Sequence, residues 1–230
     1  MKLFKLSILP IIGLSIMSHA YATTLSYDHE YEDVSQAHTD ELSISHQFDF
    51  GLGTSATLKF TPNDKPNGDS GSAFQDDRWD ETKIGLNYPI ALSHDWSIIP
   101  GVSLSRKHDE YKYKPYLKAK YKITPQLTLS ARYRREMTHY TLGKKTKLQN
   151  RYDAGASYKI NAFKLSYTFT YYQANTIIFN HEKHDYEHKI DISYKLSKHW
   201  SPFVEFKNEA VSSKLSDRQT EYKVGIDYKF

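Results

Sequence analysis

Apolar and polar residues alternate along most of this chain with a period of two. In the last segment, 220–230, one parity carries Tyr222, Val224, Ile226, Tyr228 and Phe230, and the other carries charged residues or glycine. A period of two is that of a β-strand, whose successive side chains point to opposite faces. Helical spacing would not place so many apolar residues on one parity, so the pattern predicts an all-β chain.

Twelve segments show this alternation, each with about the ten residues that a tilted strand needs to cross the hydrocarbon core of a bilayer. They are 24–33, 40–49, 52–61, 79–89, 96–106, 112–123, 127–138, 150–160, 163–173, 185–196, 200–209 and 219–230. We therefore predict one domain, 23–230, folded as a single transmembrane antiparallel β-barrel of about 12 strands. The alternative, a soluble β-sandwich, would have shorter strands and would rarely end on an aromatic strand.

The connections between these segments alternate between short and long. The short ones are 50–51, 124–126, 161–162 and 197–199, and the longer polar ones are 61–78, 139–149 and 174–184. Bacterial barrels have short periplasmic turns and longer external loops, so we expect both termini in the periplasm. Aromatic residues next to the short turns predict a girdle at that membrane interface. They are Tyr88, Trp96, Tyr121, Tyr158, Phe163, Tyr194, Trp200 and Phe230.

The N-terminus has the pattern of a secretory signal peptide. Lys2 and Lys5 precede an apolar run from Leu6 to Met17, and Ala20-Tyr21-Ala22 supplies a small-x-small cleavage site. The alternative, a membrane anchor, would need a run of about 20 apolar residues. We predict a signal peptide at 1–22 and a mature chain that begins at Thr23.

Composition separates a barrel from a secreted soluble domain. The mean hydropathy of −0.68 fits both, because the alternating strands of a barrel also average out as polar. The chain has 19 Tyr, 11 Phe and 3 Trp, and it has no Cys. Barrels concentrate aromatic residues at the two interfaces, whereas secreted domains often contain disulfides. The composition favours a barrel in the bacterial outer membrane, in contact with its lipid.

Charged residues on the inward parity are distributed unevenly. The predicted basic track consists of Lys118, Lys120, Arg132, Arg134, Arg151, Lys159 and Lys164, with Glu136 and Asp153 as the acids nearby. The strands at the two ends of the chain form a mixed, more acidic wall. Its acids include Asp28, Glu30, Glu41, Asp185, Glu187, Asp191, Glu205, Glu209, Glu221 and Asp227, and its lysines are Lys189, Lys195, Lys207, Lys223 and Lys229. We interpret the basic track as a wall that attracts and guides an anion. The alternative is that these are ordinary lumen residues, paired with acids across the bore.

The tight turn at 124–126 sets the register of its two strands. Antiparallel pairing around this turn places Arg132 about opposite Lys118 and Arg134 about opposite Tyr116, and like charges side by side repel unless something compensates. Tyr116 and Tyr172 also lie on the inward parity. They could stack against sugar rings or simply pack in the wall.

Several short motifs occur in order along the whole mature chain. They are Tyr27-Asp28-His29-Glu30, Ser35-Gln36, Ser45-His46-Gln47-Phe48, Pro100-Gly101, Ser103-Leu104, Pro115-Tyr116-Leu117-Lys118-Ala119-Lys120, Arg132-Tyr133-Arg134, Pro202-Phe203-Val204-Glu205 and Asp217-Arg218-Gln219-Thr220-Glu221-Tyr222. Together with the Phe-terminated strand they resemble the oligogalacturonate-specific porin family of the KdgM type, which also includes N-acetylneuraminate channels.

The resemblance implies a monomeric twelve-stranded outer-membrane channel for acidic oligosaccharides such as oligogalacturonates. The family's basic lumen residues carry over onto Lys118, Lys120, Arg132 and Arg134. The first two are Lys where the family pattern often has Arg, which keeps the charge but loses the planar guanidinium fork. Channels for another anionic sugar, such as sialic acid, and general small-solute porins are the alternatives.

Other chemistries find little support in the sequence. The 11 His do not form a metal-ligand pattern, since His184 and His188 lie ~13 Å apart along one strand. We predict no metal, no cofactor, no nucleic-acid partner and no catalytic residue. A barrel enzyme active at its rim and a surface adhesin that uses loop 61–78 remain the competing hypotheses. The strand that ends at Phe230 is the expected signal for the barrel assembly machinery.

Overall fold

The computed structural model describes residues 23–143 and 145–230, so the predicted signal peptide lies outside the described residues. The strands are β1 (Thr23–Glu32), β2 (His38–Gln47), β3 (Gly53–Pro62), β4 (Asp77–Asn87), β5 (Ile90–Ala91), β6 (Trp96–Arg106), β7 (Glu110–Lys122), β8 (Leu127–Tyr140), β9 (Lys147–Ile160), β10 (Phe163–Ala174), β11 (His184–Tyr194), β12 (Trp200–Ala210) and β13 (Arg218–Lys229). Among the described residues no helix is long and apolar enough to cross a membrane.

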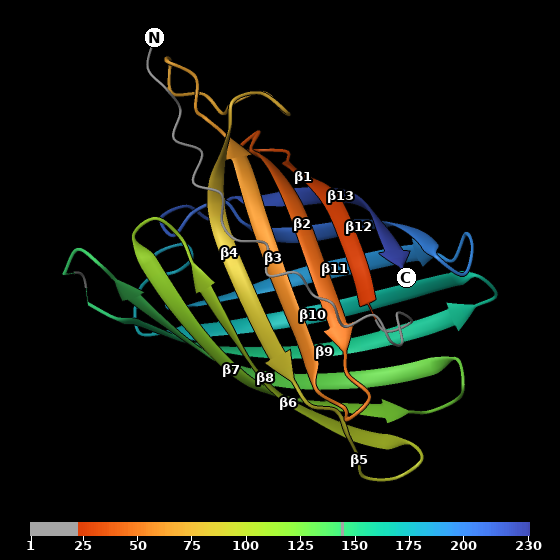
Figure 1. Cartoon of the computed structure of the whole chain (residues 1–230). Coiled ribbons are helices and arrows are strands. Elements are labelled where there is room, and N and C mark those ends of the chain that lie inside the picture. Colours follow the sequence, from red (N-terminus) through yellow and green to blue (C-terminus); the bar gives the residue numbers. More distant parts are fainter. Residues whose placement is uncertain (1–22, 144) are drawn as a thin grey trace.

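The strands form one closed antiparallel barrel (Figure 1). Sequence neighbours pair around the wall, and β1 pairs with β13 over nine residues to join its two ends. The short strand β5 pairs with β6 in the same register as β4 does, on the far side of Pro89. Because proline has no N–H to donate, it interrupts what is otherwise one strand. The wall therefore has twelve spanning strands, which confirms the predicted barrel.

The hairpin of β8 and β9 extends further than the sequence predicts. The loop predicted at 139–149 covers only 141–146 in the structure, because Met137 pairs with Leu148 and Thr138 pairs with Lys147. The polar residues here lie beyond the apolar stretch of each strand, yet their backbones still complete the ladder. Polarity marks the end of the apolar band and not the end of the strand.

The two faces of the wall have opposite chemistry. The buried side chains are nearly all polar or charged, and Pro62, Tyr172 and Ala174 are the buried apolar ones among the described residues. Large apolar side chains such as Val224, 63% exposed, and Ile84, 53% exposed, point outward. An apolar exterior and a polar interior are what a barrel in lipid requires. The parities therefore face as predicted.

The two ends of the barrel also differ. The end with the short turns, which we call the turn end, holds Phe230, whose N–H donates to the carbonyl of Thr23 (3.1 Å). The longer connections gather at the opposite, loop end (Figure 1). Aromatic rings meet in pairs at the turn end, with centroids 4.6 Å apart for Trp96 and Tyr121 and 4.8 Å apart for Phe163 and Tyr194. The residues predicted to form a girdle thus lie together beside the short turns.

Candidate functional site in the bore

A polar cavity of about 780 Å³ occupies the bore of the barrel. Its basic lining residues are Lys59, Lys83, Lys107, Lys112, Lys114, Arg134, Lys147, Arg151, Lys189, Lys207 and Lys223. Its acidic lining residues are Glu30, Glu41, Glu81, Glu136, Asp185, Glu187, Glu205, Glu209 and Glu221. Eleven cations against nine carboxylates leave only a small positive excess, so the arrangement of these charges matters more than their sum.

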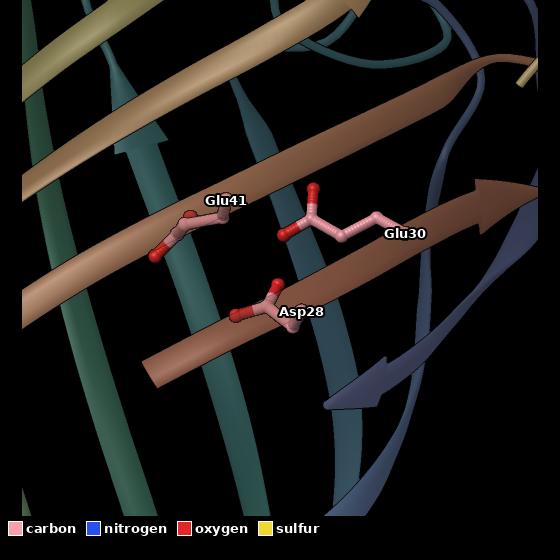
Figure 2. Close-up of side chains that lie close together, drawn as sticks. All are labelled: Asp28, Glu30 and Glu41. Atoms are coloured by element: carbon pink, nitrogen blue, oxygen red, sulfur yellow. The ribbon is translucent and has the colours of Figure 1, made fainter. Parts of the chain in front are cut away.

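One side of the bore is a wall in which acids and lysines alternate. At its β1–β2 corner, a carboxylate oxygen from each of Asp28, Glu30 and Glu41 lies within 4.8 Å of the others (Figure 2). Lys59 reaches both Glu30 (2.9 Å) and Glu41 (2.8 Å), and Lys223 reaches Glu30 at 2.6 Å. The ammonium groups of Lys59 and Lys223 therefore offset the charge of this acidic cluster.

The same pattern continues across β11, β12 and β13. Lys207 contacts Glu209 (2.8 Å) and Glu221 (2.7 Å), and Lys189 contacts Glu205 at 2.8 Å. We call the set formed by β1–β4 and β11–β13 the mixed wall. These strands were predicted to be mixed and more acidic, and in the structure their lysines pair with acids of the same wall.

The predicted lumen charges omit Lys59 and Lys83, although both line the cavity. Lys59 lies between the outward Leu58 and Phe60 of β3, and Lys83 precedes the outward Ile84 of β4. Their inward parity was the signal that could have located them. A count of lumen charge that extends the alternation to every strand would include both.

The three predicted arginines on the opposite wall are paired with acids of that wall. Asp153 accepts a hydrogen bond from Arg132 Nε (2.6 Å) and another from Arg151 Nε (2.7 Å). Arg134 contacts Glu136 at 2.8 Å. The compensating acids thus stand next to the guanidinium groups and not across the bore, as the alternative interpretation had it. Of the seven predicted residues, only Arg134 and Arg151 line the cavity itself.

The four predicted lysines are in a different situation. Lys118, Lys120, Lys159 and Lys164 make no ion pair with any carboxylate in the described part of the chain. Lys118 stands opposite Arg132, as predicted, and Lys159 stands opposite Lys164. All four lie on the turn-end side of the cavity. We call them the free lysine group, and their joint role in binding stays a prediction.

The inward tyrosines are packed into the wall. Tyr172 is only 7% exposed, donates its hydroxyl to Glu187 (2.8 Å) and has the Arg151 guanidinium over its ring at 5.2 Å. Because Arg151 covers one face of the ring and the residue is almost wholly buried, Tyr172 offers little surface for stacking against a sugar. Tyr116 leans over Gly101, where a Cβ would collide with its ring, and Arg132 lies 5.9 Å from the ring centroid. Wall packing is therefore the better interpretation for Tyr172.

Many porins are barrels with a charged bore, and comparison with known proteins shows to which porin family this chain belongs. A model of the family named oligogalacturonate-specific porin protein (KdgM) matches residues 16–230. This chain belongs to that family. The oligogalacturonate-specific porin KdgM of Dickeya dadantii (strain 3937) is 30% identical over 98% of this chain and 100% of its own length. As a member, the protein is an outer-membrane channel and not an enzyme.

Two solved porins have a fold similar to that of this chain. The KdgM porin in complex with disordered oligogalacturonate is 25% identical, with a TM-score of 0.68, and the match covers 90% of this chain and 99% of that one. The NanC porin has a TM-score of 0.73 at 21% identity, over 90% of this chain and 100% of its own. The NanC likeness shows the fold alone.

Proposed function

We propose that this porin lets acidic oligosaccharides, of the oligogalacturonate type, diffuse passively across the outer membrane. The observation that carries the proposal is the free lysine group, because these cations have no carboxylate partner among the described residues. The relative from Dickeya dadantii, which bears the name of an oligogalacturonate-specific porin, supports the choice of substrate. The loop end would face the exterior, and both ends of the mature chain would face the periplasm.

The charges define a path from the loop end to the turn end. Lys114, Lys118 and Lys120 follow one another on the inward face of β7, and six residues of strand span about 20 Å. Arg134 lines the cavity and uses one Nη for Glu136, and its Nε is buried without a hydrogen-bond partner in the described residues. A carboxylate would pass from the cavity beside Arg134 to the free lysine group, whose members have no acidic partner in the described residues. Several weak sites in series favour both entry and release.

The mixed wall lies across the bore from this path and is less attractive to an anion. Its lysines and carboxylates alternate, so an anion meets no uninterrupted positive surface there. The substrate would then keep to the wall built by β7–β10. Because Lys118 and Lys120 are point charges without a planar fork, we expect selection by charge more than by the exact shape of the sugar acid.

We further propose that the porin is exported with residues 1–22 as a cleaved signal peptide and acts as a monomer. The strand that ends at Phe230 would serve as the recognition signal for the barrel assembly machinery. These proposals rest on the apolar run after Lys5, on the closure of the wall within a single chain and on the exposed ring of Phe230 (45%).

Single-channel recording in planar bilayers tests the substrate. The reversal potential in a KCl gradient should show anion preference, and added oligogalacturonate should reduce the current. N-acetylneuraminate and a neutral oligosaccharide of equal length complete the panel. A preference for cations, or equal reduction of the current by the neutral sugar, would contradict the proposal.

A lysine variant tests the path. Lys118→Gln/Lys120→Gln should move the reversal potential toward zero and weaken the block by oligogalacturonate, because it removes half of the free lysine group. The matched control is Lys65→Gln/Lys198→Gln, which removes the same charge from an exposed loop and an exposed turn. The proposed path is wrong if the two variants shift the reversal potential equally.

A further inference from the structure

The outer surface of the barrel carries a row of tyrosines toward its loop end. Tyr133, Tyr152, Tyr171 and Tyr186 lie side by side on β8, β9, β10 and β11, because each pairs with the next across the ladder. All four are 40–44% exposed on the outward parity. Tyrosines concentrate where hydrocarbon gives way to headgroups, so this row marks the second membrane interface of the barrel.

The next outward row toward the loop end is polar. It consists of Arg135, Asn150, Gln173 and His184, which follow one another in the same register. Two residues of strand place it about 7 Å beyond the tyrosines. A charge on the outer face costs ~2–4 kcal/mol at the midplane but ~0–1 kcal/mol near an interface. Arg135 therefore stands at the level of the lipid headgroups.

Two arginines of this outer surface have no acidic partner. Arg135 donates to Asn150 Oδ1 (2.6 Å), and Arg106 lies over the ring of Tyr111 at 5.5 Å. Neither forms an ion pair within the described ranges 23–143 and 145–230. Arg218, which is also outward, reaches Asp185 at 3.0 Å. The arginines of the bore are likewise paired, so Arg106 and Arg135 are exceptions.

These two arginines share one face with a histidine and two tyrosines. Arg106 pairs with Tyr111 on β7, and Tyr111 pairs with His139 on β8, four residues beyond Arg135. The ring of Tyr113 meets that of His139 edge-on at 5.8 Å. Arg106, Tyr111, Tyr113, Arg135 and His139 form what we call the outer basic patch. Strand spacing puts the two arginine Cα atoms roughly 16 Å apart, within reach of a single large headgroup.

We propose that the outer basic patch binds the phosphate groups of a phosphorylated glycolipid in the outer leaflet. A guanidinium group offers two parallel N–H donors to a phosphate, and a headgroup with two phosphates would satisfy both arginines. The aromatic rings contact the sugar, and the apolar surface below the tyrosine row contacts the acyl chains. This site rests on the proposed orientation, in which the loop end faces outward.

The probe is lipid A with both phosphates, added to the folded porin in detergent, and bound lipid is counted by native mass spectrometry. Arg106→Gln/Arg135→Gln should lower the bound fraction about tenfold. Arg106→Lys/Arg135→Lys keeps the charge without the fork, so it should retain an intermediate amount. The control Lys107→Gln/Lys112→Gln removes the same charge from cavity-lining positions and should bind like the unchanged chain.

The outcomes separate this site from the channel function. Folding of each variant is checked by its resistance to SDS before heating. Equal binding by the Gln variant and the unchanged chain, or equal binding of dephosphorylated lipid A, would overturn the lipid site. Bilayer recordings of the unchanged chain report anion preference independently. If lipid binding is intact but anion preference is absent, the channel proposal is contradicted and the lipid site is not.

Discussion

At the scale of single residues, Asp153 organises the basic wall. Its carboxylate accepts from Arg132, from Arg151 and from the Thr170 hydroxyl at 2.7 Å, and it is 9% exposed. One buried acid therefore holds two guanidinium groups that would otherwise repel each other across β8 and β9. Asp153 thus holds both arginines in place, and its negative charge offsets one of their two positive charges.

Neutralising this acid should change selectivity and stability together. Asp153→Asn should raise anion preference, because two guanidinium groups lose their shared countercharge. It should also lower the free energy of unfolding by about 1–3 kcal/mol, since charge-assisted hydrogen bonds are lost. Reversal potentials and urea unfolding in lipid vesicles measure the two effects.

The matched control is Asp227→Asn. Asp227 is also an inward carboxylate, but it accepts its hydrogen bond from the Ser26 hydroxyl (2.6 Å) and not from a guanidinium. It removes the same formal charge without freeing an arginine, so its effect on selectivity should be smaller. Equal shifts for the two variants would mean that Asp153 acts only through its charge.

At the scale of elements, the connection between β10 and β11 shapes the mouth at the loop end. Residues 175–183 fold into a small hairpin of their own, in which Ile178 N donates to Glu182 O at 2.8 Å. Backbone bonds from Asn180 to Leu215 and from His181 to Ser213 attach this hairpin to the β12–β13 connection. Ile178 then lines both the main cavity and a side cavity of about 430 Å³.

Shortening this connection should widen the mouth. Replacing 176–182 with a short Gly-Ser linker removes the Ile178 side chain from the cavity, so single-channel conductance should rise. The barrel should still assemble, because β10 and β11 keep their eleven paired residues. Shortening 63–76 is the control, since no residue of that loop lines the cavity. A rise of the same size in the control would contradict the assigned role.

At the scale of the whole molecule, closure depends on a seam between the two ends of the chain. Gly225 of β13 stands opposite Asp28 of β1 and opposite Phe203 of β12. A Cβ at Gly225 would collide with the Phe203 ring and approach the Asp28 Cβ at 2.7 Å. The ring therefore fills the space that the missing side chain leaves, as aromatic residues do beside glycines in strongly curved sheets.

Adding a side chain at this seam should weaken closure. Gly225→Val should lower the free energy of unfolding by about 1–3 kcal/mol, because the ring must leave its place. Phe203→Ala in the same chain removes the ring but not the Asp28 Cβ, so a double-mutant cycle should show that part of the loss is recovered. Strictly additive effects would contradict the packing of Phe203 on Gly225. The midpoint temperature of the heat-induced mobility change on SDS gels ranks the stability of the single and double variants.

Much of the architecture follows from local pattern. The alternation along 220–230 and its counterparts predicts strands, faces and the twelve-stranded wall, because a period of two is a property of the strand itself. The pairing of Lys118 with Arg132 follows from a turn of three residues. The hairpin of β8 and β9 extends beyond prediction, since strand ends depend on backbone pairing and not on side-chain polarity.

The sequence by itself determined which residues face the bore, and so which charges could meet a solute. Only the tertiary structure decided which of those charges are compensated. Arg132 and Arg151 share Asp153, Lys59 serves two carboxylates, and the free lysine group has no acidic partner in the described ranges. The reason is geometric. Long side chains form ion pairs across neighbouring strands, and the curvature and stagger of the closed wall determine which charged groups come within contact distance.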